Sequence, residues 1–520
     1  MQLATLDIVI IVIYAIGLFS LAQWVSRSRT GERKDSTEYF LASKNLPWWA
    51  IGASLIAANI SAEQIVGMSG SGYAIGLAIA SYEWMAAITL VIVGKWFLPI
   101  FLKNEIYTMP QFLEQRYGTR IRTLMAVFWL ALYIFVNLTS IVWLGSIAVT
   151  KVAGVDQSTA LVALGLFALL YQLWGGLRAV AMTDIVQVTL LVLGGLMVSG
   201  LTLNEIGGGA GIVAGFRTLV ERTPDHWHMI LTQASPYYKD LPGLSVLIGG
   251  MWIANVSYWG FNQYIIQRAL AAKSLPEAQK GVIFAAYLKL LMPVIIVLPG
   301  IAAVMLAPNL ARPDEAYPSM MRLLPTGIVG LVFAALIAAI VASMASKINS
   351  IATIFTLDIY NKMGAPKSET RLVTVGRITA VVAMLLAIIT ARPLLGSFDQ
   401  AFQYIQEYTG FFTPGIVVIF LLGLFWKRAT EAGALAATVG SFALSIALKT
   451  WWPELPFMDR MGVVFLLALA LAVVCSLIWP AEQSSNRIQT ANVSFGTSAS
   501  FNVAATGVAL VLIALYTVWW

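Results

Sequence analysis

Two ionisable residues, Glu83 and Lys289, stand inside long apolar stretches of a 520-residue chain. A charge in such surroundings is costly unless it has a partner or a function. Four amide side chains occupy comparable apolar stretches, namely Gln64, Asn137, Asn255 and Gln406. The set offers donors and acceptors without an excess of one charge. That inventory suits a neutral ligand whose hydroxyl groups both donate and accept hydrogen bonds.

Tyr258 and Trp259 add an aromatic surface on which the apolar face of a ring-shaped ligand could pack. A structural interpretation stays open for every member of the set. Glu83 and Lys289 could pair only to hold two helices together, and amides within a membrane commonly bridge helices. The joint presence of these residues, and no single one of them, favours a binding site.

A second set of residues could bind a small monovalent cation through neutral oxygens. The carbonyls of Ala57 and Ile60 lie where a helix is expected to break, and a later stretch offers the Ala339 carbonyl and the Ser343 hydroxyl. Such oxygens can replace the water shell of the ion. Serine hydroxyls in helices often bond back to the preceding turn instead, so this set alone is weak evidence.

Two more charged residues could act on a cation. Asp184 could draw it towards the cytoplasmic exit, or could be a solvated helix end. Lys347 follows Ser343 by four residues and so shares its helix face. It could snorkel to the cytoplasmic interface, pair with Asp184, or compete electrostatically with the cation; we favour snorkelling or pairing.

The elements that must hold these residues are membrane helices. Hydrophobic residues make up 59% of the chain, charged residues 11%, and the mean hydropathy is +0.81, whereas soluble domains are about 25% charged. Apolar runs of about 20 residues recur, which is the length of a helix that crosses a bilayer and pairs its own backbone groups. We expect an all-α polytopic membrane protein of about 14 spans, near residues 6–25, 47–75, 79–101, 122–151, 157–176, 181–204, 243–267, 279–307, 326–357, 373–391, 400–426, 430–450, 461–480 and 502–520.

Polar and small residues interrupt two spans at a similar depth, at Ala58 to Gln64 and at Asn255 to Gly260. Discontinuous helices at matching places in two halves indicate inverted repeats with a binding site at the breaks; two kinked, closely packed helices are the alternative. The predicted division is a first span and cytoplasmic loop (1–45), a first repeat (46–204), an external loop (205–242), a second repeat (243–426) and peripheral C-terminal spans (427–520).

The loops indicate the orientation and exclude other classes of protein. Basic residues gather in alternate loops, and basic loops face the cytoplasm, so both termini are expected outside. The net charge of +7 is dispersed over these loops and is no nucleic-acid footprint. His226 and His228 share one loop and Cys475 is the single cysteine, so neither a histidine metal centre nor an enzyme's nucleophile–base pair is expected.

Over almost its whole length the chain resembles the sodium/solute symporter family, and within it the bacterial sodium/galactose and sodium/glucose symporters. The most specific stretches are Ala53 to Gln64, Gly70 to Met85, Gly175 to Gln187, Trp259 to Arg268 and Ala401 to Gly410. The resemblance implies a leucine-transporter-like core of two inverted five-helix repeats with discontinuous first helices. It also implies alternating access and sodium-coupled uptake of a neutral hexose, galactose or glucose, across a bacterial inner membrane, with Na⁺ as coupling ion and no other cofactor.

Carried over residue by residue, the resemblance implies substrate contacts at Gln64, Glu83, Asn137, Asn255, Tyr258, Lys289 and Gln406, with Tyr258 closing the inner side. It implies sodium ligands at Ala57, Ile60, Ala339 and Ser343. Ala342 and Ala86 each stand where the family has a serine, which bears on sodium affinity and on sugar preference. Symport of another small solute (inositol, a sugar acid or an amino acid), coupled to sodium or protons, is the alternative.

Overall fold

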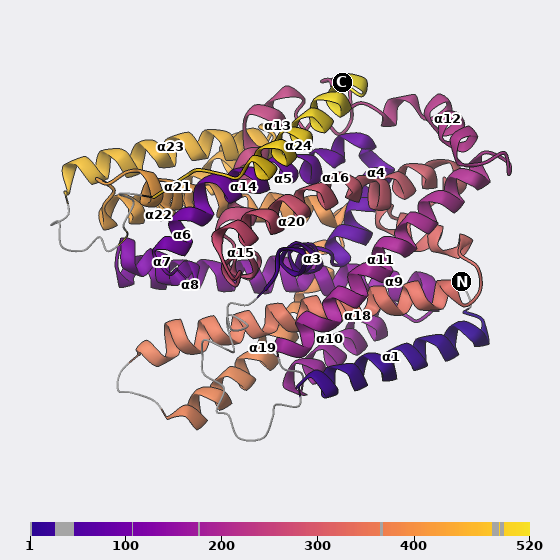
Figure 1. Ribbon diagram of the computed structural model, residues 1–520, viewed down its shortest axis with the longest axis horizontal. Helices are drawn as coiled ribbons and strands as arrows, with labels where there is room; N and C mark the ends of the chain where they lie inside the picture. The colour runs from indigo at the N-terminus through magenta and orange to yellow at the C-terminus, as the bar shows by residue number, and fades with distance from the viewer. Residues whose placement is uncertain are drawn as a thin grey trace.

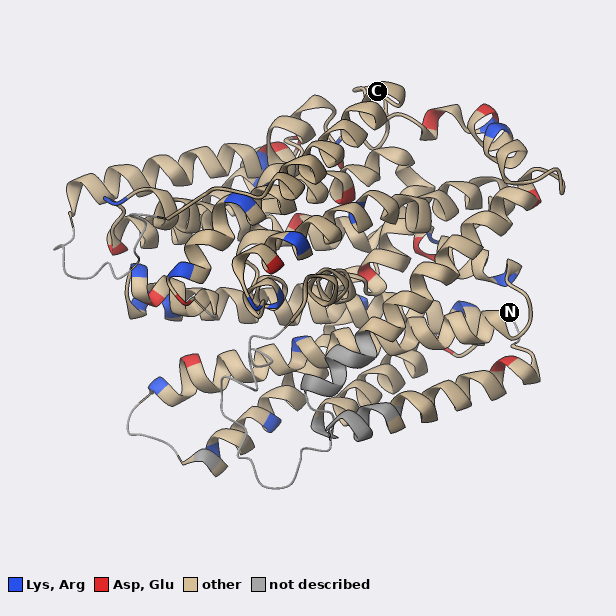
Figure 2. Cartoon of the chain, viewed as in Figure 1, with Lys and Arg blue, Asp and Glu red and all other residues tan. Residues whose placement is uncertain are grey.

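The computed structural model describes residues 3–26, 46–106, 108–174, 177–363, 368–480, 488 and 493–520, and these segments are overwhelmingly helical. Most helices run side by side along the long axis of the molecule (Figure 1), and charged residues are sparse along them (Figure 2). Within the described part, nine helices are long and apolar enough to cross a membrane, or up to 11 if each of two bent pairs is one span. The other predicted spans correspond to the shorter apolar helices α1 (Thr5–Ser26) and α10 (Gln157–Trp174) and to the segment around residue 255.

The first discontinuous helix breaks where its sequence turns polar. Helix α3 (Trp48–Asn59) ends at Ile60, whose φ of −70° and ψ of 109° are extended. The chain resumes as a π-helical turn η2 (Glu63–Met68) and helix α4 (Ser69–Ile75), bent by 67° from α3. An extended residue cannot continue the helical hydrogen-bond ladder, so carbonyls in the last turn of α3 lack helical partners.

The remaining helices of the first half follow the predicted apolar runs. They are η3 (Leu77–Ala80), α5 (Ser81–Ile92), η4 (Val93–Phe97), α6 (Leu98–Lys103), α7 (Met109–Arg116), α8 (Thr119–Ala131), η5 (Leu132–Leu138), α9 (Thr139–Ala153), α10 and α11 (Leu177–Ile206).

The span predicted at 243–267 is the second discontinuous element. It consists of α13 (Leu244–Ile248), α14 (Gly250–Val256), the π-helical turn η7 (Ser257–Phe261) and α15 (Gln263–Leu270). Asn262 between η7 and α15 is extended, with φ −83° and ψ 119°. The two breaks therefore share one local cause, a single extended residue within an otherwise helical span.

The helices after this break surround the first half. They are α16 (Leu275–Leu306), α18 (Ile328–Thr353) with η10 (Ile354–Ile359) and η11 (Tyr360–Lys362), α19 (Glu369–Leu395), the pair α20 (Ala401–Thr409) and α21 (Thr413–Phe425) bent by 47°, α22 (Glu431–Trp451), α23 (Phe457–Ile478) and α24 (Ala499–Val518). Short turns η8 (Pro313–Glu315), α17 (Ala316–Met320) and η9 (Met321–Leu323) connect α16 to α18.

Helix α16 lies in the core and packs against α3, α4, α5 and α11. At Gly300 an added Cβ would come within 2.1 Å of the Ser69 carbonyl oxygen. Glycine is therefore required at this position for α16 and α4 to approach as closely as they do.

The segment 205–242 forms a cap over one end of the bundle and includes α12 (Ile212–Arg222) and η6 (Pro224–His226). The imidazole Nε2 of His226 lies 3.1 Å from the Tyr73 carbonyl near the end of α4. The Met229 N–H donates to the carbonyl of Trp519 beyond α24, at 2.7 Å. Figure 1 shows the C-terminus beside this cap.

Helix α1 begins at the same end of the bundle. The carboxylate of Asp7 accepts the N–H groups of Gly327 at 2.6 Å and Gly330 at 3.1 Å, at the start of α18. The α16–α18 connection also reaches this end, because the Tyr73 hydroxyl donates to the Pro308 carbonyl at 2.9 Å. Both ends of the described chain therefore lie on one side of the bundle.

Candidate functional site

A central cavity of about 100 Å³ lies between the two breaks. It is bounded by η2, α5, η7, α16 and α20. Six of the seven residues predicted to contact substrate line this one cavity: Gln64, Glu83, Asn255, Tyr258, Lys289 and Gln406.

An ion pair without solvent access forms one wall of the central cavity. The Nζ of Lys289 lies 2.6 Å from Oε2 of Glu83, and the two side chains are 1% and 3% exposed. The same ammonium donates to the side-chain oxygen of Asn59 and lies 5.0 Å from the centroid of the Trp259 ring. A buried charge pair with further partners of this kind offers strong, directed donors and acceptors to a polar ligand.

Tyr258 connects this wall to the helix that follows the second break. Its hydroxyl accepts from Nδ2 of Asn59 at 3.1 Å and lies 2.5 Å from the Tyr264 hydroxyl. The ring of Tyr258 packs edge-on against Trp259, with centroids 5.2 Å apart. Tyr258 is thus fixed by both discontinuous elements at once.

The central cavity also contains polar atoms that a ligand could satisfy. Oε1 of Gln64 is buried and has no hydrogen-bond partner. Nδ2 of Asn255 bonds to the Met251 carbonyl in its own helix at 3.1 Å, and Gln406 is half-buried at the cavity wall. Ala86 lines the cavity with a methyl group. Buried polar groups normally have partners, so the unpaired acceptor of Gln64 is available to a ligand or to water.

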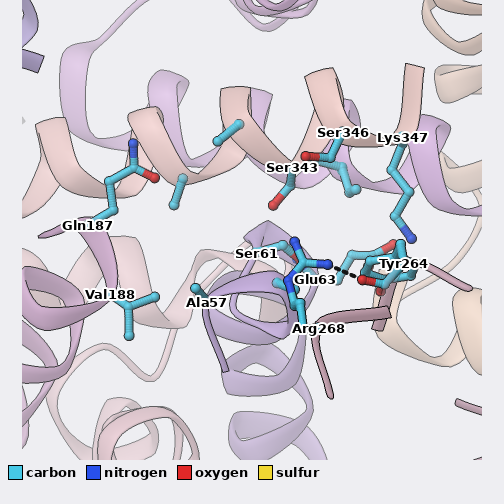
Figure 3. Close-up of a pocket in the computed structure, with 14 residues that line it drawn as sticks. Ala57, Ser61, Glu63, Gln187, Val188, Tyr264, Arg268, Ser343, Ser346 and Lys347 are labelled. Carbon is cyan, nitrogen blue, oxygen red and sulfur yellow. Dashed lines mark hydrogen bonds between the residues drawn. The ribbon is translucent and has the colours of Figure 1, made fainter. Parts of the chain in front are cut away.

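A second cavity, of about 20 Å³, lies between the end of α3 and the middle of α18 (Figure 3), and we name it the cation cavity after the predicted sodium ligands. Three of the predicted sodium ligands line it: Ala57, Ala339 and Ser343. Figure 3 shows the Ser343 side chain pointing across this cation cavity towards Ser61 at the break. Ile60 is buried at the break itself and does not line the cavity.

Asn137 lies in a different place from the other predicted substrate contacts. Its Oδ1 is 3.4 Å from Nζ of Lys347, and Asn137 also lies beside Glu63. Glu63 also accepts a hydrogen bond from Ser140, whose hydroxyl donates to Oε1 of Glu63 at 2.8 Å. The structure therefore groups Asn137 with Glu63 and Lys347 beside the cation cavity.

The snorkelling interpretation of Lys347 is wrong. The residue is only 5% exposed, and its ammonium lies 3.8 Å from the centroid of the Tyr264 ring and 5.2 Å from that of Tyr133. These aromatic rings and Asn137 hold the ammonium inside the bundle. Asp184, the alternative partner and the predicted exit residue, lies in α11 with its side chain outside the described residues.

The lining residues that were not assigned a role from the sequence include Asn59, Glu63 and Tyr264. The ionisable Glu63 within a predicted span carried a usable signal, because such residues are functional candidates by default. Asn59 was noticed only as part of the break. Nothing in the sequence distinguishes Tyr264 from an ordinary packing tyrosine.

Comparison with known proteins identifies the family. The sequence model of the sodium:solute symporter family matches residues 39–440. The chain belongs to the sodium:solute symporter family. It is 51% identical to the sodium/glucose cotransporter of Vibrio parahaemolyticus over 100% of this chain and 99% of that protein. It is also 32% identical to the sodium/myo-inositol cotransporter 2 of Bos taurus, over 93% of this chain and 78% of that protein.

Solved structures agree on the fold of this symporter. A Na⁺-coupled sialic acid symporter in an outward-open state superposes with a TM-score of 0.77 at 21% identity, covering 92% of this chain and 99% of that one. Mhp1, a nucleobase-cation-symport-1 family transporter, gives 0.56 at 11% identity, covering 87% and 98%. The expected leucine-transporter-like fold is confirmed, and the chain is a transporter and not an enzyme.

Proposed function

We propose that this chain carries a neutral hexose, galactose or glucose, into the cell together with sodium. The observation that carries the proposal is the composition of the central cavity. Its charges cancel in the Lys289–Glu83 pair, its other polar groups are amides and hydroxyls, and Gln64 presents an unpaired acceptor. A carboxylate substrate would need an uncompensated cation, which Glu83 removes.

In this proposal sodium binds between the break after α3 and α18, through carbonyls of Ala57, Ile60 and Ala339 and the hydroxyl of Ser343. These are neutral oxygens on two separate elements, so an ion that binds both favours one arrangement of the elements over another. Each ligand shifts the population of transporter states by its differential affinity for them. Sodium stabilises the outward-open state, and the hexose then closes the outside.

Tyr258 is the proposed inner closure of the sugar site. Its hydroxyl contacts to Asn59 and Tyr264 join the two discontinuous helices, so their loss would separate the helices and open the cavity inward. A membrane potential that is negative inside contributes about 2.3 kcal/mol per charge per 100 mV to the movement of sodium. Basic loops place both termini outside the plasma membrane, on the side of the 205–242 cap.

Reconstitution in liposomes tests the proposal. Labelled galactose uptake is measured under an inward sodium gradient, with potassium as the control, and with glucose, fucose, myo-inositol and proline as competitors. We expect sodium-dependent accumulation above the external concentration that hexoses block and proline does not. Gln64→Ala should abolish this accumulation in a folded protein. Absence of any hexose uptake by the wild type would contradict the substrate assignment.

Myo-inositol is the second candidate substrate, because it is also a neutral ring with several hydroxyls and the cavity has the complementary groups. The same assay separates the two: inositol that competes more strongly than galactose and glucose, and that itself accumulates with sodium, would favour this candidate.

A further inference from the structure

The cation cavity contains a positive charge that belongs to the protein. Lys347 lines it, one helical turn after Ser343 on the same face of α18. Its side chain is 5% exposed, and its contacts are the Asn137 oxygen at 3.4 Å and the faces of the Tyr264 and Tyr133 rings. The ammonium is therefore held in place beside the predicted sodium ligands and not directed to solvent.

Charged side chains line this cavity. Lys347, Arg268 and Glu63 are among its lining residues, and Glu63 interacts electrostatically with Lys347. A sodium ion that enters adds a positive charge to a cavity that already contains the Lys347 ammonium.

Position 342 is an alanine that lines the cavity with its methyl group and offers no side-chain oxygen. The hydroxyls that α18 contributes to the cavity are those of Ser343 and Ser346, beside the carbonyl of Ala339. A fixed like charge beside these neutral oxygens acts against sodium.

We propose that Lys347 is a specificity-determining residue of the cation site, whose fixed ammonium weakens sodium binding. This inference rests on the proposed location of the sodium site and deepens it. Two like unit charges within one cavity, in a medium of intermediate polarity, repel by an amount that corresponds to at least about a tenfold change in affinity. Lys347 thus raises the external sodium concentration that the transporter needs for half-maximal uptake.

Direct binding of radiolabelled sodium to purified protein, followed by scintillation proximity, tests this proposal without sugar. Lys347→Met removes the charge and keeps an unbranched side chain of similar length, and we expect sodium to bind at least about tenfold more tightly. Lys347→Arg keeps the charge and should bind sodium as weakly as the wild type. Lys239→Met removes one lysine charge from the exposed cap and should leave sodium binding unchanged.

Sodium binding by Lys347→Met that equals or falls below wild-type binding would overturn the proposal. If that variant fails to give a monodisperse protein, Lys347→Gln, which can still donate to Asn137, replaces it with the same expected direction. In proteoliposomes the sodium concentration for half-maximal uptake should fall in parallel. A wild type without hexose uptake contradicts the proposed substrate alone, because the sodium titration still decides the role of Lys347.

Discussion

The Lys289–Glu83 pair allows a test that separates helix packing from substrate binding. The two charged groups are 2.6 Å apart and at most 3% exposed. Removing one partner strands a buried charge, which costs about 3–5 kcal/mol of stability. We therefore expect Lys289→Met and Glu83→Gln each to lower the unfolding temperature markedly. The double variant contains no stranded charge and should recover most of this loss, because neutral residues of similar volume replace buried pairs at little cost.

Hexose binding should not recover in the double variant. A hydrogen bond to a charged group contributes about 1.5–3 kcal/mol, and 1.4 kcal/mol is a factor of ten in affinity. Loss of one such contact therefore weakens galactose by at least about tenfold, and loss of two by at least about a hundredfold. In the double variant the unfolding temperature should therefore recover while the galactose affinity does not. A pair with a purely structural role would not produce this difference.

The assay combines thermal unfolding of the purified protein with equilibrium binding of labelled galactose at fixed sodium. The control is the Lys151–Glu315 pair, also 2.6 Å apart but 39% and 18% exposed and away from the central cavity. The double variant Lys151→Met/Glu315→Gln should leave galactose affinity unchanged. Galactose affinity within about threefold of the wild type in the Glu83→Gln/Lys289→Met protein, well under one charged hydrogen bond, would refute the substrate role and leave the pair as a packing element.

Three further predictions concern the rest of the molecule. Burial raises the pKa of Asp314, in the connection between α16 and α18, from 3.8 to about 7 although the N–H of Ala401 bonds to it. Since the folded state holds the proton more tightly, the contribution of Asp314 to stability is full below pH 3.8 and is lost as the pH rises to about 7. The unfolding temperature should show this decline, Asp314→Asn should remove it, and the exposed Asp225→Asn should keep it. Tyr258→Phe removes two hydroxyl contacts and should raise sodium-free sugar efflux from loaded liposomes by about fivefold, as expected for about 1 kcal/mol; unchanged efflux would argue against Tyr258 as the inner closure. Gly300→Ala should cost about 1–3 kcal/mol through overpacking and lower the unfolding temperature, and an unaltered temperature would mean that the backbone at this contact can move apart.

Much of the fold follows from the sequence because membrane helices and their breaks are local features. The polar run at Ala58 to Gln64 contains the extended Ile60, and the run at Asn255 to Gly260 ends shortly before the extended Asn262. In the repeated fold, residues that are distant in the sequence lie at the same depth in the membrane. For this reason six of the predicted substrate contacts line one cavity. Local pattern and helix spacing suffice for this part of the prediction.

The placement of Asn137 and Lys347 could not be obtained in this way. Asn137 lies in η5, a π-helical turn, and the extra residue in such a turn rotates the following side chains relative to a regular helix. Lys347 is enclosed because α15 crosses beside it and supplies the ring of Tyr264. That crossing depends on tertiary packing after the second break, which helical periodicity does not encode.

The contact between the 205–242 cap and the residues that follow α24 bears on how the protein is made. Met229 donates to the carbonyl of Trp519, and the rings of Trp227 and Trp519 lie 5.1 Å apart. Domains and segments fold in the order in which the ribosome delivers them, so the cap emerges long before its partner does. During synthesis the packing of Trp227 against Trp519 therefore forms only after α24 has been inserted.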